Sequence, residues 1–124
     1  MTPDKKVLII DDDSRNIFAL KAVLKAKGFA IVSATEAREG INLLLTDAGI
    51  KVVLMDMMMP DIDGYEAIGM IRNNSAISDS IIIAVTAQAM MGDKEKCLAA
   101  GANDYVSKPV DIDLLSSLLN RYLN

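Results

Sequence analysis

The stretch VVLMDMMMPDIDG, residues 52–64, decides how the rest of the chain is interpreted. It begins with four apolar residues, two of them β-branched, which is typical of a strand buried on both faces of a sheet. The run ends at Asp56, and Pro60 with the acidic segment up to Gly64 then forces a loop. A carboxylate at the end of a buried parallel strand lies where open α/β sheets bind their ligands. Taken alone, Asp56 could equally begin a turn, so the rest of the sequence must decide.

The composition describes one domain with an aliphatic core. The chain has 124 residues, of which 52% are hydrophobic, but it has no Trp and only 4% aromatic residues. This length allows a hydrophobic core without disulfides. The net charge of −4 argues against nucleic acid or an anionic membrane as a partner. No apolar run approaches the roughly 20 residues that span a bilayer, and the N-terminus lacks the apolar stretch of a signal peptide.

Two residue types limit the chemistry and the location. Cys97 is the single cysteine, so the chain forms no internal disulfide and fits a reducing, cytoplasmic compartment. Histidine is absent, which excludes Ser-His and Cys-His nucleophiles and His-ligated zinc. The chemistry that remains depends on carboxylates, lysine, hydroxyls and a hard metal ion. Any phosphohistidine must therefore belong to a partner.

Strand-like and helical segments alternate five times along the chain. Strands are expected at residues 6–10, 29–34, 51–56, 80–85 and 104–107, and helices at residues 15–27, 37–48, 63–72, 91–100 and after residue 111. The expected N-caps are Ser14, Thr35, Asp63 and Asp111, and the expected glycines at helix ends are Gly28, Gly49 and Gly101. This alternation predicts a parallel sheet between two helix layers with right-handed crossovers. A flavodoxin-like (βα)5 three-layer sandwich with strand order 2-1-3-4-5 is one common solution at this size.

The carboxyl ends of parallel strands meet at one edge of the sheet. The polar side chains expected at that edge are Asp11, Asp12, Asp56, Thr86 and Lys108. Converging carboxylates repel one another, and a divalent ion with a preference for oxygen ligands, such as Mg²⁺, relieves this repulsion. A metal ion, a lysine and a hydroxyl around a carboxylate nucleophile are what phosphoryl transfer to Asp requires.

Four motifs in this order resemble the receiver domains of the response-regulator family. They are IIDDD (residues 9–13), MDMMMPDIDG (55–64), VTA (85–87) and DYVSKPV (104–110). The resemblance covers essentially the whole chain, and it implies one receiver domain over residues 1–124 with no output domain. The segment RNIFAL (15–20) is similar to the receivers of hybrid sensor histidine kinases.

The resemblance implies a phosphoacceptor and a metal site. Asp56 matches the residue that takes a phosphoryl group from a partner's phosphohistidine. Asp12 and Asp56 would bind Mg²⁺ directly, Asp11 through a water, and Met58 through its backbone carbonyl. Mn²⁺ is an alternative ion for the same ligands. Lys108 would pair with the phosphoryl oxygens, and its peptide bond to Pro109 is cis in many family members.

The resemblance also implies a switch. Thr86 would move toward the phosphoryl group, and the rotamer of Tyr105 would follow. The surface that contacts partners, or a second copy in a phosphorylation-dependent dimer, would include Met90, Met91 and Tyr105. Met58 and Gln88 would flank the path of an attacking water, and since neither is an evident base, the phosphoryl-Asp is expected not to be especially short-lived.

The partners implied are a sensor histidine kinase or a histidine phosphotransfer protein, with the downstream target left open. The chain would be a phosphorylated switch rather than an enzyme that turns over an external substrate. It fits a stand-alone regulator, a relay intermediate, or a receiver segment of a hybrid histidine kinase. We expect it to contact neither nucleic acid nor a membrane.

Two other functions fit parts of the pattern. In a haloacid-dehalogenase-like phosphatase Asp11 would be the nucleophile and Asp13 its partner carboxylate, but Arg15 stands where Thr or Val is expected, and there is little room for a substrate-selecting cap. A pseudo-receiver would keep the fold and act only by binding. The acidic loop at residues 59–70 does not match a calcium loop, because Met59 and Met70 occupy its first and last ligand positions. We expect the methionines near Asp56 to fill gaps in the core rather than bind copper.

Overall fold

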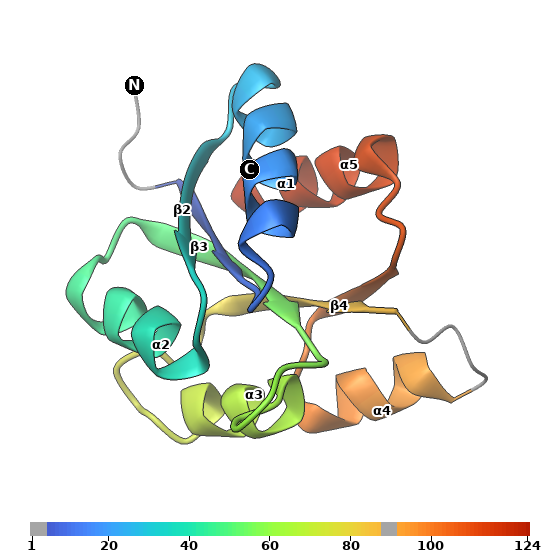
Figure 1. Cartoon of the computed structure of the whole chain (residues 1–124). Helices are drawn as coiled ribbons and strands as arrows, with labels where there is room; N and C mark the ends of the chain where they lie inside the picture. The colour runs from blue at the N-terminus through green and yellow to red at the C-terminus, as the bar shows by residue number, and fades with distance from the viewer. Residues whose placement is uncertain (1–4, 88–91) are drawn as a thin grey trace.

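A computed structural model describes residues 5–87 and 92–124 as five strands and five helices in strict alternation (Figure 1). In chain order they are β1 (Lys6–Ile10), α1 (Ser14–Ala26), β2 (Ala30–Ala34), α2 (Ala37–Thr46), β3 (Ile50–Asp56), α3 (Gly64–Arg72), β4 (Ile81–Thr86), α4 (Asp93–Ala100), β5 (Asp104–Ser107) and α5 (Ile112–Leu123). The strands form one parallel sheet in the order β2-β1-β3-β4-β5. The flavodoxin-like fold and the strand order predicted from the sequence are confirmed.

The sheet separates two hydrophobic cores. Helices α1 and α5 cover one face, and α2, α3 and α4 cover the other (Figure 1). Along β1, Val7 and Ile9 face the α1–α5 core, whereas Leu8 and Ile10 face the opposite core. Because alternate residues of a central strand point to opposite faces, both sets must be apolar, which explains the unbroken apolar runs in the sequence.

Three helix ends differ from the prediction. The N-cap of α1 is Asp13, not Ser14: its carboxylate accepts hydrogen bonds from the backbone N–H groups of the next two residues, and Ser14 is already helical. Thr35 does not cap α2: the N-cap is Glu36, whose side chain makes no capping hydrogen bond. The same helix ends at Thr46 rather than at residue 48, because the Asp47 carboxylate accepts from the Gly49 N–H and turns the chain away. The C-cap is Asp47, so the prediction that Gly49 ends this helix is wrong.

The other predicted caps are confirmed. The Asp63 and Asp111 carboxylates accept from backbone N–H groups in the first turns of α3 and α5. Gly28 has a positive φ of 97° after α1, and Gly101 has one of 120° at the end of α4. The start predicted for the fourth helix, Met91, lies outside the described residues, and within them α4 begins at Asp93.

No helix in the described parts of the chain has the length and apolarity that crossing a membrane requires.

Gly64 allows α3 to begin directly beneath the end of β3. A Cβ at this position would lie 2.5 Å from the Met57 Sδ, 2.6 Å from the Met57 Cα and 2.9 Å from the Asp56 carbonyl oxygen. Two of these contacts involve backbone, which cannot move without shifting the strand end. Gly69, on the same helix, has no atom within 4 Å of such a Cβ.

We therefore expect opposite effects from two alanine substitutions in α3. Gly64→Ala should lower the free energy of unfolding by about 1–3 kcal/mol because the added methyl displaces the backbone of β3. Gly69→Ala should raise it by up to about 1 kcal/mol because alanine is the better helix former. Urea denaturation of both variants measures the difference, and a Gly64→Ala variant as stable as Gly69→Ala would contradict this packing.

Candidate functional site

The four strands β1, β3, β4 and β5 bring the predicted polar side chains to one edge of the sheet. Asp11 directly follows β1, Asp56 and Thr86 are the last residues of β3 and β4, and Lys108 directly follows β5. The register sets their common height, since Asp56 lies beside Val85 and Thr86 beside Ser107. The sheet therefore assembles the predicted constellation.

Three carboxylates converge at this edge. Asp11, Asp12 and Asp56 each place one oxygen within 4.8 Å of the others. Asp11 and Asp56 are only 5% and 4% exposed, whereas Asp12 is exposed. The cluster consequently has a buried floor and one open side. Its donors are all carboxylate oxygens, which suit a hard divalent ion such as Mg²⁺.

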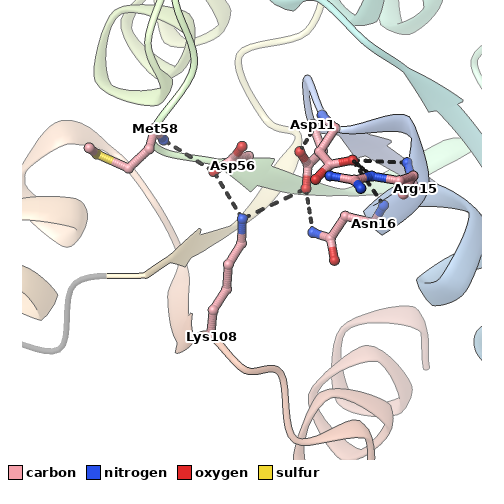
Figure 2. Close-up of polar contacts among 7 residues, drawn as sticks. Asp11, Arg15, Asn16, Asp56, Met58 and Lys108 are labelled. Carbon is pink, nitrogen blue, oxygen red and sulfur yellow. Dashed lines mark hydrogen bonds and ion pairs between the residues drawn. The ribbon is translucent and has the colours of Figure 1, made fainter.

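Lys108 supplies the positive charge of the site. Its ammonium lies 3.5 Å from Asp56 Oδ1 and 3.8 Å from Asp11 Oδ2. Figure 2 shows the side chain extending from the end of β5 toward the space between the two carboxylates. The peptide bond to Pro109 is cis, as the resemblance implied. The backbone N–H of Lys108 donates to the Thr86 carbonyl at 2.7 Å, which fixes the start of this loop against β4.

Burial alters the acidity of Asp56. The loss of solvent raises its pKa from the usual 3.8 to about 6, and the charge of Asp11 adds to the increase. The Met58 N–H, which donates to Asp56 Oδ1 at 3.1 Å, and the Lys108 ammonium act in the opposite direction. Lys108 thus compensates the buried negative charge only in part, and an additional cation is favourable here.

The methionines around Asp56 have two different environments. Met57 and Met59 are buried in the core beneath α2 and α3, as expected of residues that fill gaps. Met58 is 55% exposed, so its side chain is free to vary while its backbone faces the site. That the Met58 carbonyl binds a metal ion stays a prediction.

The structure locates two of the residues to which the resemblance assigns the switch. Thr86 is buried at the end of β4, and Tyr105 is half-buried in β5 against the core beneath α2, α3 and α4. Gln88, Met90 and Met91 lie outside the described residues. Cys97 is fully buried in the core beneath α2, α3 and α4.

The sequence analysis missed one polar residue of the site, Asn16. Its side-chain amide donates to Asp11 Oδ2 at 2.7 Å, while the Asp13 N–H donates to Asp11 Oδ1 at 2.9 Å (Figure 2). Asn16 stands in the first turn of the helix that follows the acidic run, where side chains can point back to the strand end. A polar, uncharged residue at this place was the available signal.

Comparisons with known proteins agree with this geometry. A family model described as the response regulator receiver domain matches residues 7–120. Hybrid signal transduction histidine kinase I of Dictyostelium discoideum is 37% identical over 122 residues, which cover 94% of this chain and 7% of that protein. The chain thus spans a small part of this relative.

Two solved structures share the fold closely. The receiver domain of sensor histidine kinase PA1611 from Pseudomonas aeruginosa PAO1, with a magnesium ion coordinated in its active site cleft, has a TM-score of 0.86 and 31% identity, and the match covers 96% of this chain and 97% of that one. The receiver domain of Saccharomyces cerevisiae Ssk1, co-crystallised with the histidine phosphotransfer protein Ypd1, has a TM-score of 0.85 and 28% identity over 99% of this chain and 91% of that one. The chain therefore belongs to the response regulator receiver domain family, whose members are switches of two-component phosphorelay systems.

Proposed function

We propose that Asp56 is the phosphoacceptor of this receiver. The observation that carries the proposal is a buried carboxylate at the end of the central strand β3, beside a lysine ammonium at 3.5 Å and two further carboxylates. An oxygen of Asp56 attacks the phosphorus of a phosphohistidine. The P–O bond forms as the P–N bond breaks, and the departing imidazole takes a proton from solvent.

Asp11, Asp12 and Asp56 would hold Mg²⁺ in this reaction, with the Met58 carbonyl as a further ligand. When bound, the ion neutralises charge on the transferred phosphoryl oxygens. The magnesium in the PA1611 receiver supports this assignment. The same oxygen ligands fit Mn²⁺ as an alternative.

Lys108 and Thr86 would contact the phosphoryl group after transfer. Lys108 pairs with one of its oxygens, because its ammonium already lies between the two buried carboxylates. The Thr86 hydroxyl donates to another, and Tyr105 in the adjacent strand changes rotamer with it. These movements shift an existing equilibrium between two conformations and so alter the surface that partners contact.

The phosphoryl donor would be a histidine kinase or a histidine phosphotransfer protein, since this chain has no histidine of its own. The Ssk1–Ypd1 complex supports this class of partner. The receiver would act by docking, and it would turn over no external substrate. The single cysteine fits a cytoplasmic setting.

Acetyl phosphate provides the first test. We expect a Mg²⁺-dependent gain of one phosphoryl group in intact-mass spectrometry, mapped to Asp56 and lost in Asp56→Asn. Asp61→Asn is the matched control, because Asp61 lies in the following loop at a positive φ of 64° that asparagine tolerates. It should be phosphorylated like the wild type.

Each failure of this experiment has a distinct meaning. A phosphoryl group on Asp11 would support the phosphatase alternative. No adduct on any residue would leave a pseudo-receiver that acts only by binding.

The raised pKa of Asp56 generates a second prediction. Because the folded pKa of about 6 exceeds the unfolded value of 3.8, the metal-free native state holds the extra proton between these values, and its stability falls as the pH rises through them. In EDTA, the free energy of unfolding should therefore decrease from about pH 5 to about pH 7.5 more steeply for the wild type than for Asp56→Asn.

Mg²⁺ should reverse this loss. It binds the ionised cluster, so the increase in melting temperature on adding Mg²⁺ should be larger at about pH 7.5 than at about pH 5. Differential scanning calorimetry with and without EDTA measures both effects. An equal Mg²⁺ effect at the two pH values, or one that persists in Asp56→Asn, would contradict the proposed ligand set.

A further inference from the structure

Asp11 is surrounded by donors that differ in kind. Its side chain is 7% exposed. Oδ1 accepts from the Asp13 N–H at 2.9 Å, and Oδ2 accepts from the Asn16 amide at 2.7 Å. The Lys108 ammonium is farther from Oδ2, at 3.8 Å. The neutral amide, and not the cation, therefore makes the short hydrogen bond to this oxygen.

Lys108 makes no short hydrogen bond to either buried carboxylate. A charge-assisted hydrogen bond between ammonium and carboxylate is about 2.7–2.9 Å long. The contacts of Lys108 with Asp56 at 3.5 Å and with Asp11 at 3.8 Å are both longer. A buried carboxylate oxygen needs a donor, and among the described contacts of Asp11 Oδ2 the next donor after Asn16 is the Lys108 ammonium. Without Asn16, the lysine would approach Asp11 and withdraw from Asp56.

Asn16 is held firmly enough to have this effect. It stands in the first turn of α1, where its N–H donates to the Asp13 cap at 3.4 Å. Its side chain lines a cavity of about 260 Å³ together with Asp11, Asp56 and Lys108. Figure 2 shows its amide approaching Asp11 from the side of the helix, whereas Lys108 approaches from β5.

We infer that Asn16 is a positioning residue: by saturating Asp11 Oδ2 with a neutral donor, it keeps Lys108 available for the phosphoryl group on Asp56. This inference rests on the proposed function, because it assigns Lys108 its role there. An amide suits the task, since it provides the donor without adding charge to a site that must attract a divalent cation.

A double-mutant cycle tests the inference. Asn16→Ala should slow Mg²⁺-dependent phosphorylation by acetyl phosphate about tenfold. If the effect passes through Lys108, the same substitution in a Lys108→Ala background should change the residual rate by less than about twofold, because the two changes are then strongly non-additive.

Asn16→Ser, whose hydroxyl is too short to reach Asp11, should behave like Asn16→Ala and gives a second variant if the first folds poorly. Asn42→Ala, at an exposed position of α2, is the control and should leave the rate unchanged.

A metal-free measurement separates this inference from the proposed function. In EDTA, the NMR signals of the Lys108 side chain, assigned with Lys108→Arg, should shift in Asn16→Ala as the ammonium moves to Asp11, and should stay in place in Asn42→Ala. Unchanged Lys108 signals, or a rate loss of equal size in the two backgrounds, would overturn the inference while Asp56 phosphorylation of the wild type stands. Absence of wild-type phosphorylation would refute the proposed function instead, and the NMR comparison would still decide the position of Lys108.

Discussion

The cost of keeping two carboxylates buried side by side is the constraint on which this structure depends. Asp11 and Asp56 are almost fully enclosed at the ends of neighbouring strands, and the raised pKa of Asp56 reflects that enclosure. The chain does not remove the cost by pairing each carboxylate with its own cation. It provides one ammonium, a neutral amide and two backbone N–H groups, and so leaves a site with a deficit of positive charge.

The fold makes this arrangement rigid, but it restricts most positions of the central strands to apolar residues. Both faces of β1 and β3 pack against helices, so polar side chains are confined to the strand ends: Lys6 and Lys51 at the starts, and Asp11 and Asp56 at the edge that carries the site. Close packing extends to the end of β3 itself, where Gly64 gives α3 room against Met57. Asp56, the proposed phosphoacceptor, is thereby attached to a tightly packed strand end, which would favour precise alignment with an incoming phosphorus.

Most of the fold and the centre of the site could be predicted from the sequence because they depend on local patterns. Unbroken apolar runs before Asp11, Asp56 and Thr86, together with a short strand before Lys108, suffice to place these residues at one edge of a parallel sheet. The sequence could not predict that Asp13 rather than Ser14 caps the first helix, because both residue types are good caps and the backbone conformation selects between them. It also could not predict contacts between distant segments, because these contacts follow no periodic pattern.

Arg72 is the clearest of these contacts. Its guanidinium donates to the carbonyls of Ser78 and Ser80 at 2.7 and 2.6 Å, to the Gly101 carbonyl at 2.7 Å and to Asn103 Oδ1 at 2.8 Å, and so joins the end of α3 to the loops before β4 and β5. The sequence predicted only that the third helix ends at Arg72, and not that this side chain joins three segments.

Formal charge explains why a neutral residue at position 16 would suit the proposed switch. Three ionised carboxylates and one ammonium give the cluster a net charge of −2, which a single divalent cation neutralises. A second ammonium in place of the Asn16 amide would remove half of that deficit and weaken the attraction for the metal ion. A carboxylate would instead increase the deficit and draw Lys108 away from Asp56. The amide donates to Asp11 without changing the net charge. Under the proposed function, the site would therefore depend on the metal ion before phosphorylation, and Lys108 would remain available for the phosphoryl group afterwards.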